Sequence, residues 1–137
     1  TPNSIGYVEL SYILDAINAK PVSIDQGAGP VLPTAENASV TLASSPTLNE
    51  DGNIILDIDY TTQVTGAYPI SIVTYEIVCS AGLDARKNPE LVAAFLAFAA
   101  SDSGQKLLGD IGYVPLSGDL LTGVRQSVDT VLAGAVR

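Results

Sequence analysis

The 137-residue sequence contains no histidine, no methionine and no tryptophan, and it has a single cysteine, Cys79. Without histidine, neither a Ser-His-Asp nor a Cys-His relay can be built from this chain. Zinc and transition-metal sites lose their commonest ligand, and one cysteine cannot replace it. We therefore expect a protein that is not an enzyme, with no catalytic residue, no metal and no cofactor. Cys79 cannot form an intrachain disulfide, and its apolar neighbourhood favours a small buried side chain over a reactive thiol.

Basic charge is also scarce, because six Lys and Arg stand against fifteen Asp and Glu, giving a formal net charge of −9. Nucleic acid and anionic membrane surfaces are unfavourable partners, since both require clustered basic residues. No apolar run reaches the roughly 18 residues of a membrane span. The hydrophobic fraction of 47% and charged fraction of 15% indicate a folded, sheet-rich domain with a real core.

The absence of methionine has a further consequence, because the chain begins Thr1-Pro2-Asn3. A translated protein starts with Met, so we expect residues upstream of Thr1. Any signal peptide or lipid-attachment cysteine would lie there.

Residues 66–79 are the stretch around which we expect the fold to be organised. From Ile70 to Cys79 the run is almost continuously apolar, which predicts a strand covered on both faces. Pro69 has no N–H to donate and suits the first residue of a strand. Gly66 gives the preceding backbone freedom. The ordinary interpretation is a core strand after a turn. The functional alternative is a segment that carries the chain from one lobe to another.

The rest of the pattern predicts alternating short strands and helices. Thr34 is a suitable N-cap, and Pro89 stands at the first position of a helix. The wide apolar stripe of the helix that starts at Pro89 predicts deep burial. Strands are expected at residues 5–8, 22–24 and 54–60, and helices at residues 9–18, 35–43, 89–100 and 105–110 and after Ser117.

Few residues suggest chemistry. Asp57 and Asp59 would share a strand face and could act as acid and base, but a solvated polar face is the better interpretation. Residues 49–53 have the acidic character of a calcium loop without its ligand spacing, so a turn is favoured. Residues 37–39 match the glycosylation acceptor pattern. Helix N-termini would offer N–H groups to an anion near Thr34, Asn88, Ser103 and Ser117.

Four passages together resemble the C-terminal half of the PstS-type phosphate-binding proteins of bacterial ABC transporters. Residues 4–12 (SIGYVELSY) resemble the family's IGYVE-x-x-Y passage from strand to helix. Residues 67–75 (AYPISIVTY) resemble its YPI or WPI entry, and residues 33–37 (PTAEN) a passage before a helix. Residues 112–117 (GYVPLS) are similar to LGY-x-PLP, with Ser117 in place of the second proline. The order and spacing agree over essentially the whole chain.

The resemblance implies an α/β fold of the type II periplasmic-binding class, in which two lobes share the chain. Residues 1–66 would be part of the second lobe, and residues 67–137 would supply the crossover strand and the C-terminal helices that complete the first. Gly66, Tyr68 and Pro69 are then hinge candidates. The implied partners are a phosphate ion, an ABC permease and the N-terminal half of the same protein. The implied location is extracytoplasmic, periplasmic or at the cell surface, with a lipid anchor upstream as one option.

One departure qualifies what the resemblance implies. The family's phosphate-contacting residues include an Arg and a Ser-Gly-Thr run, and they lie in its N-terminal half. Neither has a counterpart here, so we expect the phosphate-binding residues upstream of Thr1 and none in this segment. Residues 1–137 alone should then fold poorly, because the central strand would lack neighbours. Two alternatives stay open: a ligand-free structural or surface-interaction module on the same scaffold, and binding of another oxyanion such as sulfate or molybdate.

Overall fold

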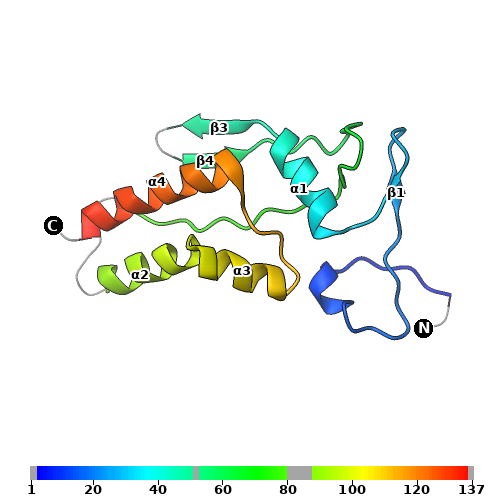
Figure 1. Cartoon of the computed structure of the whole chain (residues 1–137), viewed down its shortest axis with the longest axis horizontal. Helices are drawn as coiled ribbons and strands as arrows, with labels where there is room; N and C mark the ends of the chain where they lie inside the picture. The colour runs from blue at the N-terminus through cyan, green and yellow to red at the C-terminus, as the bar shows by residue number, and fades with distance from the viewer. Residues whose placement is uncertain (1–2, 51–52, 80–87, 136–137) are drawn as a thin grey trace.

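The computed structural model describes residues 3–50, 53–79 and 88–135. Helices and strands are mixed along the chain, as the sequence predicts, and Figure 1 shows their arrangement. In chain order they are the 3-10 turn η1 (Leu10–Tyr12), β1 (Ile24–Asp25), β2 (Pro30–Val31), α1 (Ala35–Ser44), β3 (Thr47–Glu50), β4 (Asn53–Leu56), α2 (Pro89–Ala99), α3 (Asp102–Asp110) and α4 (Gly118–Ala135).

The strands form two antiparallel hairpins. In the first, Ile24 pairs with Val31. In the second, Thr47 pairs with Leu56 across the hairpin. Among the described residues these are the only strand pairs, so the larger sheet expected around residues 70–79 is not formed within this part of the chain.

The helices begin where local signals place them. The Thr34 hydroxyl accepts the N–H of Asn37 at 3.2 Å, as expected for the N-cap of α1. Pro89 is the first residue of α2, as predicted. α3 begins earlier than predicted, because Ser101 provides its cap. α4 follows directly after Ser117.

The helical part is built on the contact between α2 and α4. Its buried side chains are small and few: Ala93 and Leu96 from α2, Ala100 after it, and Val131 from α4. A buried glutamine, Gln105, connects the elements. Its Nε2 donates to the carbonyl of residue 99 at 2.8 Å, and its Oε1 accepts the N–H of residue 116 at 2.6 Å.

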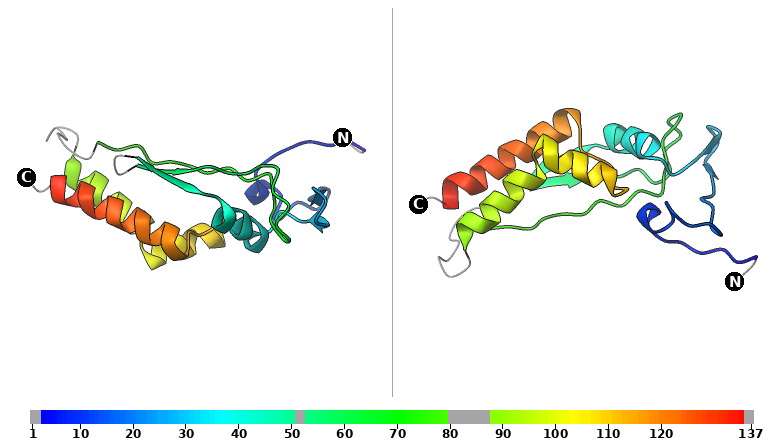
Figure 2. Two further views of the ribbon diagram at one scale, coloured as in Figure 1. Left: turned by 90° about the horizontal axis from the view of Figure 1, so that it is seen from above. Right: turned by 60° about the horizontal axis from the view of Figure 1, so that its bottom comes forward.

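Residues 70–79 run as an extended segment beside the β3–β4 hairpin. Figure 2 (left) shows the hairpin and this segment as one thin layer, with the helices on one side of it. The N–H of Leu56 in β4 donates to the hydroxyl of Tyr75 at 3.0 Å, so the two are joined through a side chain. The opposite side of the layer carries no helix of the described chain.

The prediction of a buried core strand at residues 70–79 is therefore wrong for this chain. These residues form no strand, and Ile72 and Ile77 are 86% and 95% exposed. Cys79 is exposed as well, so its predicted burial is also wrong. The physical reason is that a strand needs hydrogen-bonded neighbours, and composition alone does not supply them.

The N-terminal region also departs from expectation. Residues 5–8 form no strand, and the helix expected at residues 9–18 is reduced to η1. Its apolar residues Leu14 and Ile17 are exposed, so no packing surface supports a helix there. The strand predicted at residues 54–60 ends at Leu56.

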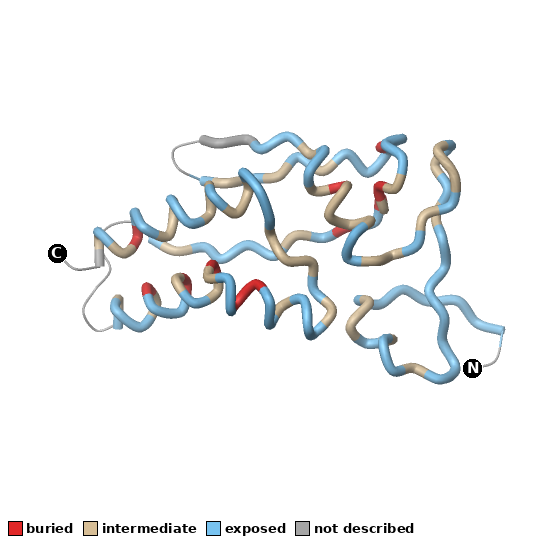
Figure 3. Tube along the Cα trace, viewed as in Figure 1, coloured by how far each residue is buried: buried red, intermediate tan, exposed pale blue. Residues whose placement is uncertain are grey.

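The deep burial predicted for α2 holds on one face only. Leu91, Phe95 and Phe98 are each more than half exposed, whereas Ala93 and Leu96 are buried. Figure 3 shows how few positions along the chain are buried. The apolar stripe of α2 is thus wider than the surface available to cover it.

Candidate functional site

The hinge candidates lie where the loop after β4 turns back onto α1. Gly66 has φ +80°, a left-handed conformation that favours glycine. Ala67 and Pro69 are buried, and Tyr68 is partly buried between them. Burial raises the pKa of the Tyr68 phenol. The structure thus places the three candidates together in residues 66–69, a short segment packed against α1 that we call the crossing segment.

Tyr68 is attached to α1 through both of its peptide groups. Its N–H donates to the carbonyl of Asn37 at 3.1 Å. Its carbonyl accepts the hydroxyl of Thr41 at 2.7 Å and that of Ser71 at 3.0 Å. Thr41 is only 1% exposed, so its bond to Tyr68 is shielded from water. Neither Thr41 nor Ser71 was singled out from the sequence, because the signal is a contact between distant segments.

The first turn of α1 supports this attachment. The side-chain amide of Asn37 donates to the carbonyl of Leu32 at 2.9 Å, which fixes the entry of the helix. A backbone N–H at the helix start and the Thr34 hydroxyl lower the pKa of Glu36. The side-chain amide of Asn37, the first residue of the glycosylation pattern at residues 37–39, is thus engaged in an exposed hydrogen bond to the backbone before α1.

The structure also brings together two of the passages that carry the family resemblance. The Tyr113 hydroxyl approaches the carboxylate of Glu9 at 3.5 Å. Gly112 has φ +90°, and a Cβ there would lie 3.0 Å from Leu14 and 3.2 Å from the Cα of Ser11. Residues 112–117 therefore contact the end of the 4–12 passage and Leu14 just beyond it, and the close approach at residue 112 requires a glycine.

The acidic residues considered from sequence have structural roles. The carboxylate of Asp59 accepts the N–H and the hydroxyl of Thr61 at 2.8 and 2.7 Å. Both hydrogen bonds lower the pKa of Asp59, and the bond from the Thr61 hydroxyl has the larger effect. Asp57 is exposed beyond the end of β4, so the two carboxylates form no acid–base pair on a strand. In the described ranges no group of three or more Asp, Glu, Cys or His is arranged to hold a metal ion.

In the turn at residues 25–30, the exposed carboxylate of Asp25 is bound by the backbone of the turn itself. Asp25 accepts the N–H groups of Gly27 and Gly29 at 2.8 and 3.1 Å, and both glycines have φ near +100°. The side chain of Gln26 donates to the carbonyl of Tyr60 at 2.7 Å. The donors of this turn are thus occupied by a protein carboxylate, and the turn is tied to the loop that precedes the crossing segment.

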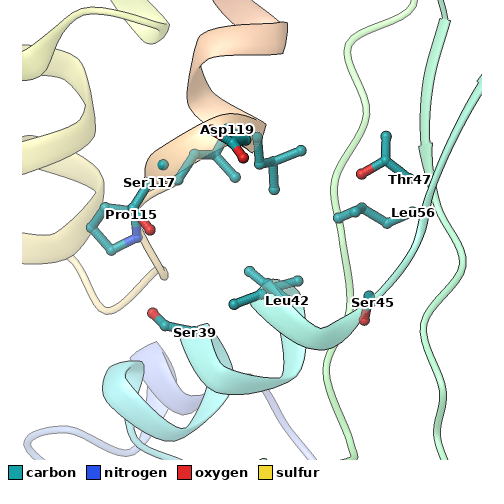
Figure 4. A pocket seen from close by; sticks show the side chains of 12 residues that line it. Ser39, Leu42, Ser45, Thr47, Leu56, Pro115, Ser117 and Asp119 are labelled. Carbon is teal, nitrogen blue, oxygen red and sulfur yellow. The ribbon is translucent and has the colours of Figure 1, made fainter.

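A cavity of about 280 Å³ lies between α1, the β3–β4 hairpin and the start of α4. Figure 4 shows the hydroxyls of Ser39, Ser45 and Ser117 and the carboxylate of Asp119 around it. Ser39 and Ser45 already donate to carbonyls of α1, at 2.8 and 2.7 Å, so they are left as acceptors. None of the described lining residues is Lys or Arg. The described lining therefore offers no cationic side chain to an oxyanion, and the carboxylate of Asp119 would repel one.

Each of the four helix N-termini considered from the sequence is present. Helices α1, α3 and α4 begin near Thr34, Ser103 and Ser117, and Asn88, with φ +48°, directly precedes α2. At α1 and α3 the first-turn N–H groups are met by side-chain caps. In the part of the chain that the structure describes, no helix is long and apolar enough to span a membrane.

The profile of the PBP superfamily domain matches residues 1–103. The chain is 31% identical over 134 residues to the phosphate-binding protein PstS3 of Mycobacterium bovis (strain BCG / Pasteur 1173P2), covering 96% of this chain and 36% of that protein. It is 34% identical over 119 residues to PstS2 of the same strain, covering 85% and 32%. The phosphate-binding protein PstS 3 of Mycobacterium leprae (strain TN) is 33% identical over 119 residues, with the same coverage.

The chain thus spans about a third of the length of the curated relatives it matches. No solved structure matches it. The resemblance drawn from the four sequence passages is confirmed by these matches, as is the α/β, periplasmic-binding-protein-like fold class.

Proposed function

The chain belongs to the PBP superfamily, and from this membership we propose that it forms part of an extracytoplasmic phosphate-binding protein that delivers phosphate to an ABC permease. One observation carries the proposal: relatives aligned over 85–96% of this chain are phosphate-binding proteins by name. The chain contributes scaffold in this proposal, and the residues that contact phosphate lie upstream of Thr1.

The chemistry of the described residues supports this division of roles. The cavity beside α1 carries acceptors and a carboxylate. The donor-rich turn at residues 25–30 is filled by Asp25. A dehydrated oxyanion needs a convergent set of donors, and the carboxylate present at each of these places, Asp119 or Asp25, would repel it. Binding without catalysis also agrees with the absence of histidine.

We further propose that two bodies share the chain, with the crossing segment between them. The sequence-based boundary falls between residues 66 and 67. The bonds of Tyr68 to Asn37 and Thr41 favour a later boundary, because residues 67–71 would move with α1. Ser71 is held to α1 indirectly, through its hydrogen bond to Tyr68, so a pivot that separates α1 from the following chain must lie beyond Ser71. In this proposal Gly66, Tyr68 and Pro69 fix the path of the chain, and the bend begins after Ser71.

Isothermal titration tests the proposed function on a protein that carries this chain together with its upstream residues. We expect heat of binding at micromolar phosphate, and weaker or no heat with sulfate and molybdate. Saturable heat with one of those ions in place of phosphate would select the other-oxyanion alternative. No heat with any of the three would favour the ligand-free interaction module.

A further inference from the structure

The corner between α3 and α4 is firmly held. The N–H groups of residues 112 and 113 donate to carbonyls in the last turn of α3 at 3.2 and 3.0 Å. Gly112 is left-handed, as is usual for the residue that ends a helix. Beyond it, the N–H of Leu116 donates to the buried side chain of Gln105 at 2.6 Å. Residues 112–116 are therefore fixed to α3 at both ends.

Residues 9–14 lie against this corner. The Tyr113 hydroxyl approaches the carboxylate of Glu9 at 3.5 Å. A Cβ on Gly112 would lie 3.2 Å from the Cα of Ser11 and 3.0 Å from Leu14. We call these five residues the clasp. In the part of the chain that the structure describes, no hydrogen bond joins residues 9–14 to α1 or to the β1–β2 hairpin, so the corner is the surface that holds this passage.

The clasp crosses the proposed boundary between the two bodies, because residues 9–14 precede the pivot after Ser71 and the corner follows it. The same corner continues into residues 115–120, which face α1 across the cavity of about 280 Å³. The bodies are thus in contact at the clasp and apart at the cavity beside it. The β3–β4 hairpin also contacts α4, and Figure 1 shows that this contact and the clasp lie at different places along the helices.

We propose that Gly112 and Tyr113 are positioning residues for phosphate binding, because the clasp keeps the two bodies close to each other before phosphate arrives. This inference rests on the proposed function. When a ligand is enclosed between two bodies, its apparent affinity falls as the binding-competent arrangement becomes less populated. A clasp that favours the close arrangement therefore raises the affinity for phosphate without touching the ion.

Phosphate titration tests the clasp in a protein that carries this chain together with its upstream residues. Tyr113→Phe removes one hydroxyl and should weaken phosphate affinity about 2-fold. Gly112→Ala places a methyl group against residues 11 and 14 and should weaken it about 10-fold. Gly118→Ala is the matched control, because residue 118 also has a positive φ, +57°, but a Cβ there meets nothing within 4 Å. Tyr7→Phe is the control for the phenol, since Tyr7 is fully exposed.

A distance measurement distinguishes a clasp from a general defect of the fold. Spin labels at Asp15→Cys and Gln126→Cys, with Cys79→Ser, would report the separation across the boundary at two exposed positions. Without phosphate, Gly112→Ala should move the distance distribution to longer values, and saturating phosphate should shorten it again. Should the Gly112→Ala protein not fold, Tyr113→Phe gives the same comparison.

The outcomes are distinct. An unchanged affinity in Gly112→Ala overturns the proposal, as does a weaker affinity without a change in distance, which would assign the effect to the fold. Tighter phosphate binding also overturns it, because the contact would then hold the bodies apart. If the unsubstituted protein binds no phosphate, the proposed function fails, and the distance alone decides the clasp: a longer distance in Gly112→Ala supports it, and an unchanged distance overturns it.

Discussion

At the scale of single residues, Thr41 matters most for the crossing segment. Its hydroxyl is buried and donates to Tyr68 at 2.7 Å, and the alternative acceptor, the carbonyl of Asn37, lies at 3.4 Å. A hydroxyl has one proton to donate, so the shorter contact takes it. The link between α1 and the crossing segment therefore depends on a group that threonine and serine share and valine lacks.

Replacing Thr41 with valine should lower the free energy of unfolding by about 1–3 kcal/mol, because the shape is kept while a buried carbonyl loses a donor. Thr41→Ser should cost less, since the hydroxyl remains. Denaturant unfolding measures both, and hydrogen exchange at the Tyr68 amide reports the local effect. Equal stability of the valine and serine variants would show that the hydroxyl bond does not hold the segment.

Glu36 provides a titration test of the start of α1. A backbone N–H and the Thr34 hydroxyl lower its pKa, so the folded state favours the carboxylate. Any stability from this source is present above the ordinary pKa of a glutamate, and it is lost as the pH falls through the lowered value. In an NMR titration, Thr34→Val should move the Glu36 pKa up toward its ordinary value, whereas Thr34→Ser should not.

A matched control for that titration is available at Asp59, whose pKa is lowered by the hydroxyl and N–H of Thr61. Thr61→Val should raise the pKa of Asp59 and leave Glu36 unchanged. A Glu36 pKa that does not respond to Thr34→Val would mean that the hydroxyl does not contact the carboxylate in solution.

At the scale of helices and strands, the sequence predicted what is locally determined. Thr34 and Pro89 mark the starts of α1 and α2 because a cap or a prolyl ring acts within one turn. Residues 70–79 have strand composition, but whether they pair depends on neighbours elsewhere. Likewise the stripe of α2 indicated its apolar face but not how much of it would be covered. The Thr41–Tyr68 contact joins residues 27 positions apart and has no sequence signature.

The corner between α2 and α3 gives a prediction at this scale. A Cβ on Gly104 would clash with the carbonyl oxygen of Phe98, a contact that backbone atoms cannot relieve without moving the corner. Gly104→Ala should therefore lower the free energy of unfolding by about 1–3 kcal/mol or more. The corner also holds Gln105 and its bonds to residues 99 and 116, so the α2–α4 packing should loosen with it.

Gly123 in α4 is the matched control, because a Cβ there meets only Ile54 at an ordinary 3.5 Å. Gly123→Ala should leave stability unchanged or raise it by up to about 1 kcal/mol through helix propensity. Thermal or urea unfolding of the two variants measures the contrast. Equal effects of the two alanines would mean that the α2–α3 corner is wider in solution than described.

At the scale of the whole molecule, the chain has more surface than its core can stabilise. The buried apolar side chains are Ala67, Pro69, Ala93, Leu96, Ala100 and Val131, among the residues that the structure describes. Four of these six positions are alanine or valine, and small side chains contribute little apolar area each. The large aliphatic and aromatic residues stand mainly on the outside, including Tyr7, Ile17 and Ile77.

This distribution predicts the unfolding behaviour of residues 1–137 alone. The denaturant dependence of the unfolding free energy, m, scales with the surface exposed on unfolding. The folded chain exposes 9874 Å², against about 6700 Å² expected for a compact monomer of 14.1 kDa, so roughly 3000 Å² of that surface is already exposed. For this reason m in urea should lie at or below the lower end of the usual ~1–3 kcal/mol/M, with a broad transition. The chain should also bind a hydrophobic dye before it unfolds.

With the upstream residues attached, m should rise by more than the added length requires, because both parts then bury their shared surface. A sharp transition of ordinary m for residues 1–137, without dye binding, would mean that Ile72 and its neighbours are covered within this chain.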